Sequence, residues 1–238
     1  MGDDRFSFPA NVIAGKRRLD VDDLMILRKH AFSDGIRTQG DLRLLLAIQR
    51  SCASSCPEWN SYLVESVASY AVHMLHPRGW IDDANADWLI DTLSIRGIVH
   101  CPLELEALLH TLEIAASAPD RLYAFALEQM RLGMAPAARN AYAVSRPSHA
   151  VGVDMADLHY LWRVLRSASN SGRLVLSAIE REILQAIDAL ADPADHHAGW
   201  NTLADALLPA PRAASGPRKS YWLRLADENM PDGQARAA

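Results

Sequence analysis

Three glycines, Gly35, Gly97 and Gly172, stand where a calcium-binding helix–loop–helix would need them. In an EF-hand loop, a glycine at position 6 lies among oxygen ligands at positions 1, 3, 5 and 12. Around Gly35 these positions hold His30, Phe32, Asp34 and Asp41. Around the other two glycines they hold Thr92, Ser94, Arg96 and Leu103, and Ser167, Ser169, Ser171 and Ala178. Only the first loop offers two carboxylates, so we expect EF-hand-like turns without calcium ligands, in which glycine supplies a left-handed turn.

Histidine and cysteine spacing gives no recognised zinc pattern. His73 and His76 are three residues apart, and His196 and His197 are adjacent. Cys52 and Cys56 lie one helical turn apart and could hold a soft metal with a third ligand, although a buried apolar cysteine is the commoner role. We therefore expect no metal site and no cofactor.

Carboxylates cluster at helix starts, most densely at Asp82, Asp83 and Asp87. Helix capping explains acid in a first turn, and an acidic metal-binding patch is the alternative reading. No Gly-x-Ser-x-Gly elbow, phosphate-binding loop or dinucleotide fingerprint occurs. We expect a protein that is not an enzyme; a pocket assembled from scattered residues such as His73, His100 and Asp87 is the weaker alternative.

Composition favours a soluble helical protein. The chain has 238 residues, with 38 Ala and 31 Leu, a net charge of −5 and a pI near 6.0. This charge excludes nucleic-acid binding by the whole chain. No apolar run is long enough to span a membrane, and the acidic start does not resemble a signal peptide. With an odd number of cysteines, three, and no Cys-x-x-Cys pair, we expect a reducing, cytoplasmic location.

Helical periodicity recurs three times with glycine and proline in the same places. Paired glycines bracket predicted first helices at 22–33, 83–95 and 154–169. Second helices follow, with capping boxes at Thr38/Asp41 and Ser177/Glu180 and with Cys101-Pro102 in the middle copy. Pro57, Pro119 and Pro193 then open third helices. The pattern predicts an all-α fold of about nine helices in three tandem three-helix pseudo-repeats, without strands.

The predicted repeat boundaries follow from this spacing of glycine and proline. Repeat 1 covers residues 1–76, repeat 2 covers 77–132 and repeat 3 covers 153–208, with a linker at 133–152 that contains Pro136 and Pro147. Residues 209–238 carry five basic and three acidic groups and begin with a Pro- and Ala-rich stretch, so they form a predicted flexible basic tail.

Aromatic residues divide into predicted core and predicted surface. Trp59, Trp88, Trp162 and Trp200 stand at helical spacing beside Leu or Val and are expected in the core. Trp80 lies in a turn. In the tail, Tyr221 and Trp222 are flanked by Arg218 and Arg224, and this apolar island either folds back onto the body or docks into a partner. We take Tyr221, Trp222, Arg218, Arg224 and Trp80 as candidate partner-binding residues.

Three glycine turns share a pattern of glycine, a short spacer, an acid and a leucine-rich helix: Asp34-Gly35-Ile36 with Asp41 and Leu45, Gly97-Ile98-Val99 with Glu104 and Leu108, and Gly172 with Val175 and Glu180. This pattern resembles the TerB-like helical family (tellurite-resistance protein B and relatives). The resemblance covers about half of the chain. It implies an all-helical bundle and, for some members, an acidic metal-binding surface linked to stress or membrane-associated complexes. This sequence has the Asp-Gly pair only at 34–35, so no metal ligand is carried over.

Repeated helices without a catalytic set favour a binding protein. The sequence therefore predicts a non-enzymatic helical binding or scaffold protein with an unidentified protein partner; its oligomeric state is not predicted. The alternative is a TerB-like metal-responsive stress protein that uses acidic helix N-termini.

Overall fold

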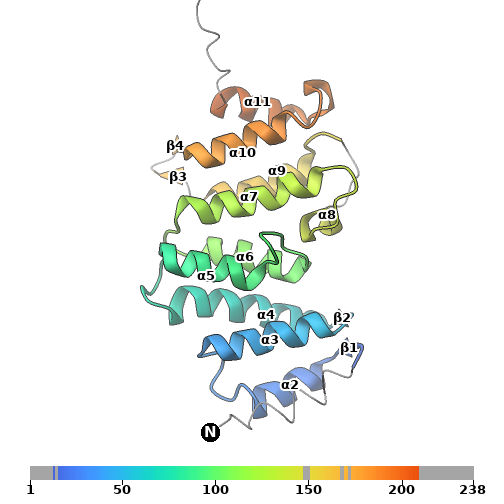
Figure 1. Ribbon diagram of the computed structural model, residues 1–238, viewed down its shortest axis with the longest axis vertical. Helices are drawn as coiled ribbons and strands as arrows, with labels where there is room; N and C mark the ends of the chain where they lie inside the picture. The colour runs from blue at the N-terminus through green and yellow to red at the C-terminus, as the bar shows by residue number, and fades with distance from the viewer. Residues whose placement is uncertain (1–12, 14–15, 147–150, 167–168, 171–172, 209–238) are drawn as a thin grey trace, which may run out of the picture. The chain divides into compact units, whose positions relative to one another are not determined.

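The computed structural model describes residues 13, 16–146, 151–166, 169–170 and 173–208, and these residues are mostly helical (Figure 1). All described residues belong to one compact part of the chain, Met1–Leu208, which is separate from a second part, Pro209–Ala238. The predicted tail is the second part, which lies outside the described residues. The all-α prediction is confirmed for the described residues.

Ten α-helices occur in the described residues, and Figure 1 labels them α2 to α11. They are α2 (Val21–His30), α3 (Gln39–Ser51), α4 (Pro57–Ser69), α5 (Asp83–Leu93), α6 (Pro102–Ile114), α7 (Asp120–Met134), α8 (Ala141–Ser145), α9 (Met155–Leu165), α10 (Ala178–Asp188) and α11 (Ala198–Leu207). A π-helical turn, η2 (Tyr70–Met74), continues α4, and a 3-10 turn, η4 (Pro193–Asp195), precedes α11. The helix α8 lies within the predicted linker, and its Tyr142 is buried.

Four two-residue strands were not predicted. The strands β1 (Arg18–Leu19) and β2 (Ser54–Ser55) pair in parallel, with Leu19 opposite Ser55. The strands β3 (Ser169–Asn170) and β4 (Arg173–Leu174) pair antiparallel. A two-residue strand is too short to show the alternation of apolar and polar residues by which strands are recognised in a sequence.

The predicted caps are confirmed. The Thr38 side chain accepts from the Asp41 backbone N–H at the start of α3, and Asp41 accepts in return from the Thr38 backbone N–H. Ser177 and Glu180 form the same reciprocal pair at the start of α10. Cys101 makes no side-chain cap at the start of α6, where proline occupies the first turn. These caps fix where the second predicted helices begin.

Glycine and proline act mostly as predicted. Gly35 has φ +77° and Gly97 has φ +79°, in the left-handed region that favours glycine; Gly172 lies outside the described residues. Pro57 occupies the first turn of α4, and Pro119 is the N-cap of α7. Pro193, however, opens the 3-10 turn η4, and α11 begins only at Ala198, where the His197 side chain caps the helix.

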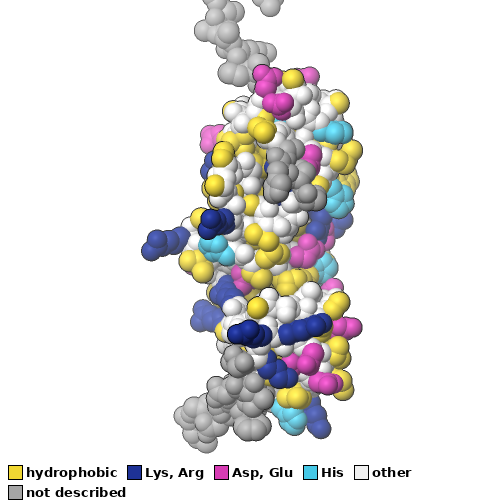
Figure 2. Space-filling model, turned by 90° about the vertical axis from the view of Figure 1, so that its right-hand side faces the viewer, with side chains coloured by type: hydrophobic (Ala, Val, Ile, Leu, Met, Phe, Trp, Pro, Cys, Tyr) yellow, Lys and Arg dark blue, Asp and Glu magenta, His cyan; other side chains and the backbone are white. Residues whose placement is uncertain are grey.

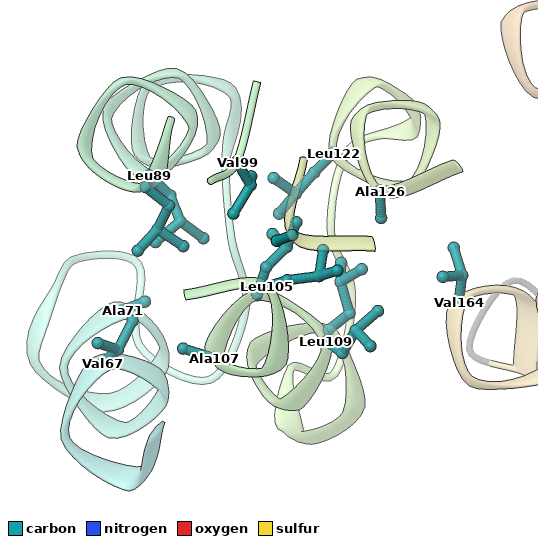
Figure 3. Close-up of a cluster of buried hydrophobic side chains, with 14 of the residues drawn as sticks. Val67, Ala71, Leu89, Val99, Leu105, Ala107, Leu109, Leu122, Ala126 and Val164 are labelled. Carbon is teal, nitrogen blue, oxygen red and sulfur yellow. The ribbon is translucent and has the colours of Figure 1, made fainter. Parts of the chain in front are cut away.

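Leucine and small side chains from successive helices form one buried cluster (Figure 3). The most extensive helix–helix contacts join α4 to α6 and α7 to α10. In Figure 3, Val67 of α4 and Leu89 of α5 point toward Leu105 of α6, and Val164 of α9 points toward Ala126 of α7. The core therefore continues from helix to helix along the chain.

The tryptophan predictions are confirmed only in part. Trp59 and Trp200 are fully buried, and Trp88 is half-buried. Trp162 was expected in the core, and this is wrong, because 64% of its surface is exposed. Its helical spacing is correct, but α9 turns Leu161, Val164 and Leu165 to the core and leaves Trp162 on the opposite face.

Candidate binding surface

Of the predicted partner-binding residues, Tyr221, Trp222, Arg218 and Arg224 lie outside the described residues. Trp80 is 52% exposed. Its neighbours fix this orientation: the Gly79 carbonyl accepts from the Ala116 N–H, and the Ile81 N–H donates to the Ser117 carbonyl. Trp80 lies in a bend, and its side chain faces solvent while the side chain of the next residue, Ile81, is buried.

The sequence did not indicate a larger exposed apolar surface on α9. Met155 is 62% exposed and Trp162 is 64% exposed, and His159 is exposed between them. These three residues are spaced four and three positions apart, so they share one face of the helix. We call Met155, His159 and Trp162 the α9 stripe.

A pocket of about 190 Å³ opens beside the α9 stripe. Its lining comes from three helices and includes Glu106 of α6, Tyr142 of α8, His159 and Arg163 of α9, and Arg146, which follows α8. A large apolar side chain beside a pocket with a few fixed polar groups is typical of a binding surface.

Asp157 is the centre of the polar network below this pocket. Its side chain is fully buried and accepts hydrogen bonds from the Tyr142 hydroxyl and from Arg146, whose Nε and Nη2 lie 3.0 and 2.6 Å from its carboxylate oxygens. It also accepts from the Asp154 backbone N–H and completes the capping box of α9. The carboxylate therefore joins α8 to the first turn of α9.

The two buried tyrosines act as hydrogen-bond donors. The ring centroids of Tyr142 and Tyr160 lie 4.7 Å apart in an edge-to-face arrangement, and the Tyr160 hydroxyl donates to the Ala126 carbonyl of α7 at 2.8 Å. Burial raises the pKa of the Tyr142 hydroxyl, and the neighbouring Asp157 raises it further; burial also raises the pKa of Tyr160. Both phenols stay protonated near neutral pH, which suits a structural role.

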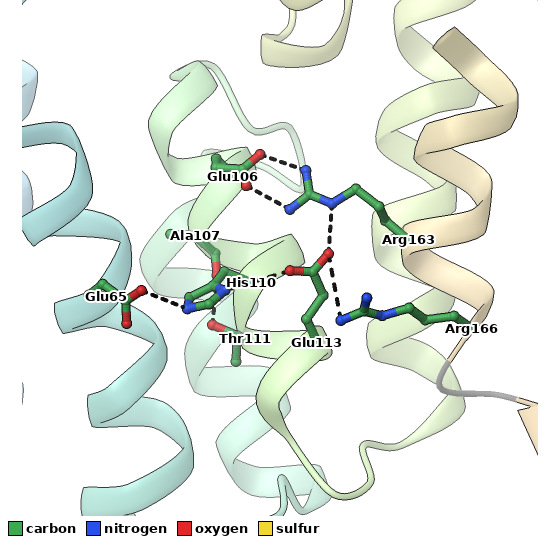
Figure 4. Close-up of polar contacts among 8 residues, drawn as sticks. All are labelled: Glu65, Glu106, Ala107, His110, Thr111, Glu113, Arg163 and Arg166. Atoms are coloured by element: carbon green, nitrogen blue, oxygen red, sulfur yellow. Dashed lines mark hydrogen bonds and ion pairs between the residues drawn. The ribbon is translucent and has the colours of Figure 1, made fainter. Parts of the chain in front are cut away.

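Arg163 links α9 to α6 through two carboxylates (Figure 4). Its terminal nitrogens donate to both oxygens of Glu106 at 2.8 and 2.6 Å, and its Nε donates to Glu113 at 2.7 Å. The pKa of Arg163 is raised, chiefly by the hydrogen bonds that it donates to Glu106. Burial alone would raise the pKa of Glu113, but the hydrogen bond and charge of Arg163 lower it below its usual value.

The network continues to α4 through His110. Its Nε2 lies 3.2 Å from a Glu65 oxygen, and its Nδ1 lies 3.6 Å from a Glu113 oxygen (Figure 4). The polar contacts therefore run across α4, α6 and α9 beneath the exposed side of α9. They hold the helix that carries the α9 stripe in a fixed position.

Replacing Glu113 by glutamine is expected to lower the free energy of unfolding by about 1–3 kcal/mol near neutral pH. Because the pKa of Glu113 is lowered by folding, its contribution is present above the unfolded value and is lost as the pH falls through the folded value. Urea unfolding of both proteins at about pH 7 and about pH 3 should show a smaller difference at the lower pH. An equal loss at both pH values would contradict this role, and Glu65→Gln, at a side chain 68% exposed, is the control.

The residues considered for catalysis are not assembled around one site. His73 is exposed in η2, and Asp87 pairs with Arg121 of α7 at 2.9 Å. His100 lines a pocket of about 650 Å³ with Cys52, Cys101 and Glu104. Burial raises the pKa of Glu104 although Arg50 donates to it at 2.6 Å.

The candidate metal ligands serve as structural groups. Asp41 accepts from the Arg37 and Thr38 backbone N–H groups, and Asp82 caps α5 by accepting from the Asn85 N–H. Cys52 and Cys56 are buried and carry no disulfide. Within the described ranges, no three His, Cys, Asp or Glu side chains gather in a way that could hold a metal ion.

None of the described helices combines the length and apolar character needed to cross a lipid bilayer. No protein-family model, curated protein or solved structure matched the chain.

Proposed function

We propose that this chain is a non-enzymatic helical binding or scaffold protein that engages a protein partner through the α9 stripe. The observation that carries the proposal is the exposure of Met155 and Trp162 on one face of a helix whose other contacts are fixed by Asp157 and Arg163. An exposed aromatic residue on a rigid element is the kind of group that contributes most to protein–protein binding.

The proposal includes three tandem modules: module 1 (α2, α3, α4), module 2 (α5, α6, α7) and module 3 (α9, α10, α11). In each, the segment before the first helix is hydrogen-bonded to the segment before the third. The Cys56 N–H donates to the Leu19 carbonyl at 3.0 Å in module 1. The corresponding bond in module 3 runs from the His197 N–H to the Val153 carbonyl at 2.8 Å. In module 2 donor and acceptor are exchanged, and the Ile81 N–H donates to the Ser117 carbonyl at 2.9 Å.

The first helices of the modules share one register. Asp20, Asp82 and Asp154 are their N-caps, and a buried leucine follows seven positions later in each: Leu27, Leu89 and Leu161. The same cap followed by the same buried position supports a duplicated helix.

A hydrogen bond from a buried tryptophan to a polar side chain also recurs between the second and third helices. The Trp59 indole N–H donates to the Gln49 side-chain oxygen at 2.6 Å in module 1, and Trp200 donates to Asp188 at 2.8 Å in module 3. At the same two positions module 2 has Leu112 and Leu122, both fully buried. Modules 1 and 3 thus have a hydrogen-bonded pair where module 2 has an apolar pair. Both positions change together because a buried polar group without a partner is destabilising.

A photo-cross-linking residue at position 162 tests the function. In cells of the native host, it is expected to trap a specific protein that the same residue at Asp91, an exposed position on α5, does not trap. Trp162→Ala in an affinity purification should lose that protein while thermal stability changes by less than about 0.5 kcal/mol, because the side chain is exposed. Equal yields from positions 162 and 91, or from the wild type and the Trp162→Ala variant, would contradict the proposal.

A further inference from the structure

The outer face of α2 is apolar and uncovered in the part of the chain that the structure describes. Met25 is 63% exposed, Ile26 is 44% exposed and Val21 is 42% exposed. With Phe32 and Tyr62, Met25 and Ile26 line a groove of about 940 Å³. Three basic residues in the last turn of α2 border it: Arg28, Lys29 and His30.

The equivalent face is covered in modules 2 and 3. Six positions after its N-cap, α5 carries Trp88, whose ring centroid lies 5.7 Å from that of Tyr70 at the end of the preceding α4–η2 helix. The same position of α9 is Tyr160, which donates to the Ala126 carbonyl of the preceding α7. In α2 this position is Ile26. Ile26 therefore occupies the position through which modules 2 and 3 each pack on the module before them.

The two ends of the described body carry opposite charge. Residues 16–50 contain eight Lys or Arg and five Asp or Glu, whereas residues 175–208 contain one Arg and six Asp or Glu. Glu182, Asp192, Asp195 and Asp205 are exposed at this second end, as are the apolar Val175 and Ile179. On the face shown in Figure 2, Lys and Arg side chains gather in the half that holds α2 to α5, where acidic side chains also lie, and acidic side chains lie at the end that holds α11.

We propose that the α2 face binds the acidic α10–α11 end of a second copy of this chain, head to tail. The inference rests on the modules proposed above, because it continues their packing from one molecule to the next. Apolar contact at Ile26 supplies the attraction, and the opposite charges set the orientation of the two copies. Each copy keeps one unoccupied end, so the contact is heterologous and permits chains longer than a dimer.

Sedimentation velocity tests the association over about a hundredfold range of protein concentration. The wild-type chain is expected to form larger species as concentration rises, and added salt should weaken them because exposed charges are screened. Ile26→Asp should raise the dissociation constant at least about tenfold, since it places a carboxylate in the apolar contact. Val144→Asp, at a side chain 66% exposed on α8, should leave the association unchanged.

Mixing two variants distinguishes a head-to-tail contact from other forms of association. The Ile26→Asp variant keeps its acidic end, and a Glu182→Lys/Asp205→Lys variant keeps its α2 face. Each should be monomeric alone, and an equimolar mixture should form a dimer and nothing larger. A wild-type chain that is monomeric at every concentration, or a mixture that stays monomeric, would overturn the proposal.

Trp162→Ala separates this inference from the proposed function. It should associate like the wild type, since the α9 stripe is not part of the contact. If the Trp162→Ala variant no longer associates and the Ile26→Asp variant still does, self-association occurs through the α9 stripe and the proposed α2 contact is wrong. Cross-linking from position 162 reports on the proposed function whichever way the sedimentation experiment ends.

Discussion

Asp157→Ala is expected to lower the free energy of unfolding by about 3–5 kcal/mol. The substitution deprives the Arg146 guanidinium, whose side chain is 7% exposed, of the carboxylate that it contacts through two nitrogens. It also removes the acceptor of the Tyr142 hydroxyl and half of the capping box of α9. Urea unfolding measures the loss.

Asp23→Ala is the matched control. Asp23 occupies the same position of α2, three residues after the N-cap, and completes a capping box in the same way. Its partner Lys16 is 42% exposed at the side chain, so water replaces the lost interaction. We expect a loss of about 1 kcal/mol for Asp23→Ala. Equal losses for the two variants would show that Asp157 acts as a cap alone and would contradict the network.

The combination of Gln49→Leu and Trp59→Leu is expected to be less destabilising than the sum of the two single substitutions. Trp59→Leu leaves a buried amide oxygen without its donor and opens a cavity, at a cost of about 2–4 kcal/mol. Gln49→Leu leaves the buried indole N–H without its acceptor, at about 1–3 kcal/mol. The double variant reproduces the Leu112 and Leu122 pair of module 2, with no polar group left over.

A double-mutant cycle from urea unfolding measures this coupling, which we expect to be about 1–2 kcal/mol in favour of the double variant. Gln49→Leu combined with Trp200→Leu is the control, because these residues belong to different modules. Its two losses should add to within about 0.5 kcal/mol. A coupling in the control as large as that of the Gln49–Trp59 pair would contradict the prediction, because it would show that the coupling does not come from the hydrogen bond between Gln49 and Trp59.

Local signals made most of the helices predictable. A hydroxyl at Thr38 or Ser177 with an acid three residues later is a cap whose two hydrogen bonds depend only on neighbouring residues. Gly35 and Gly97 adopt positive φ where the chain reverses between helices, and Pro57 occupies a first turn that needs no N–H from it.

The candidate site could not be predicted in the same way, because it depends on which side of α9 the core lies. Met155 and Trp162 have the spacing of a core stripe, and only the packing of Val164 against α7 shows that the opposite side is buried. The Asp157–Arg146 contact joins residues of α9 and the segment after α8, and α8 itself is too short to give a helical period.

An experimental structure of the full chain, with the three modules superimposed, tests the central claim of tandem duplication most directly. Tandem duplication predicts that Leu27, Leu89 and Leu161 coincide, and that the Gln49–Trp59 and Asp188–Trp200 pairs overlie Leu112 and Leu122. Modules whose helices differ in order or direction, or whose buried leucines fall at different places, would contradict it.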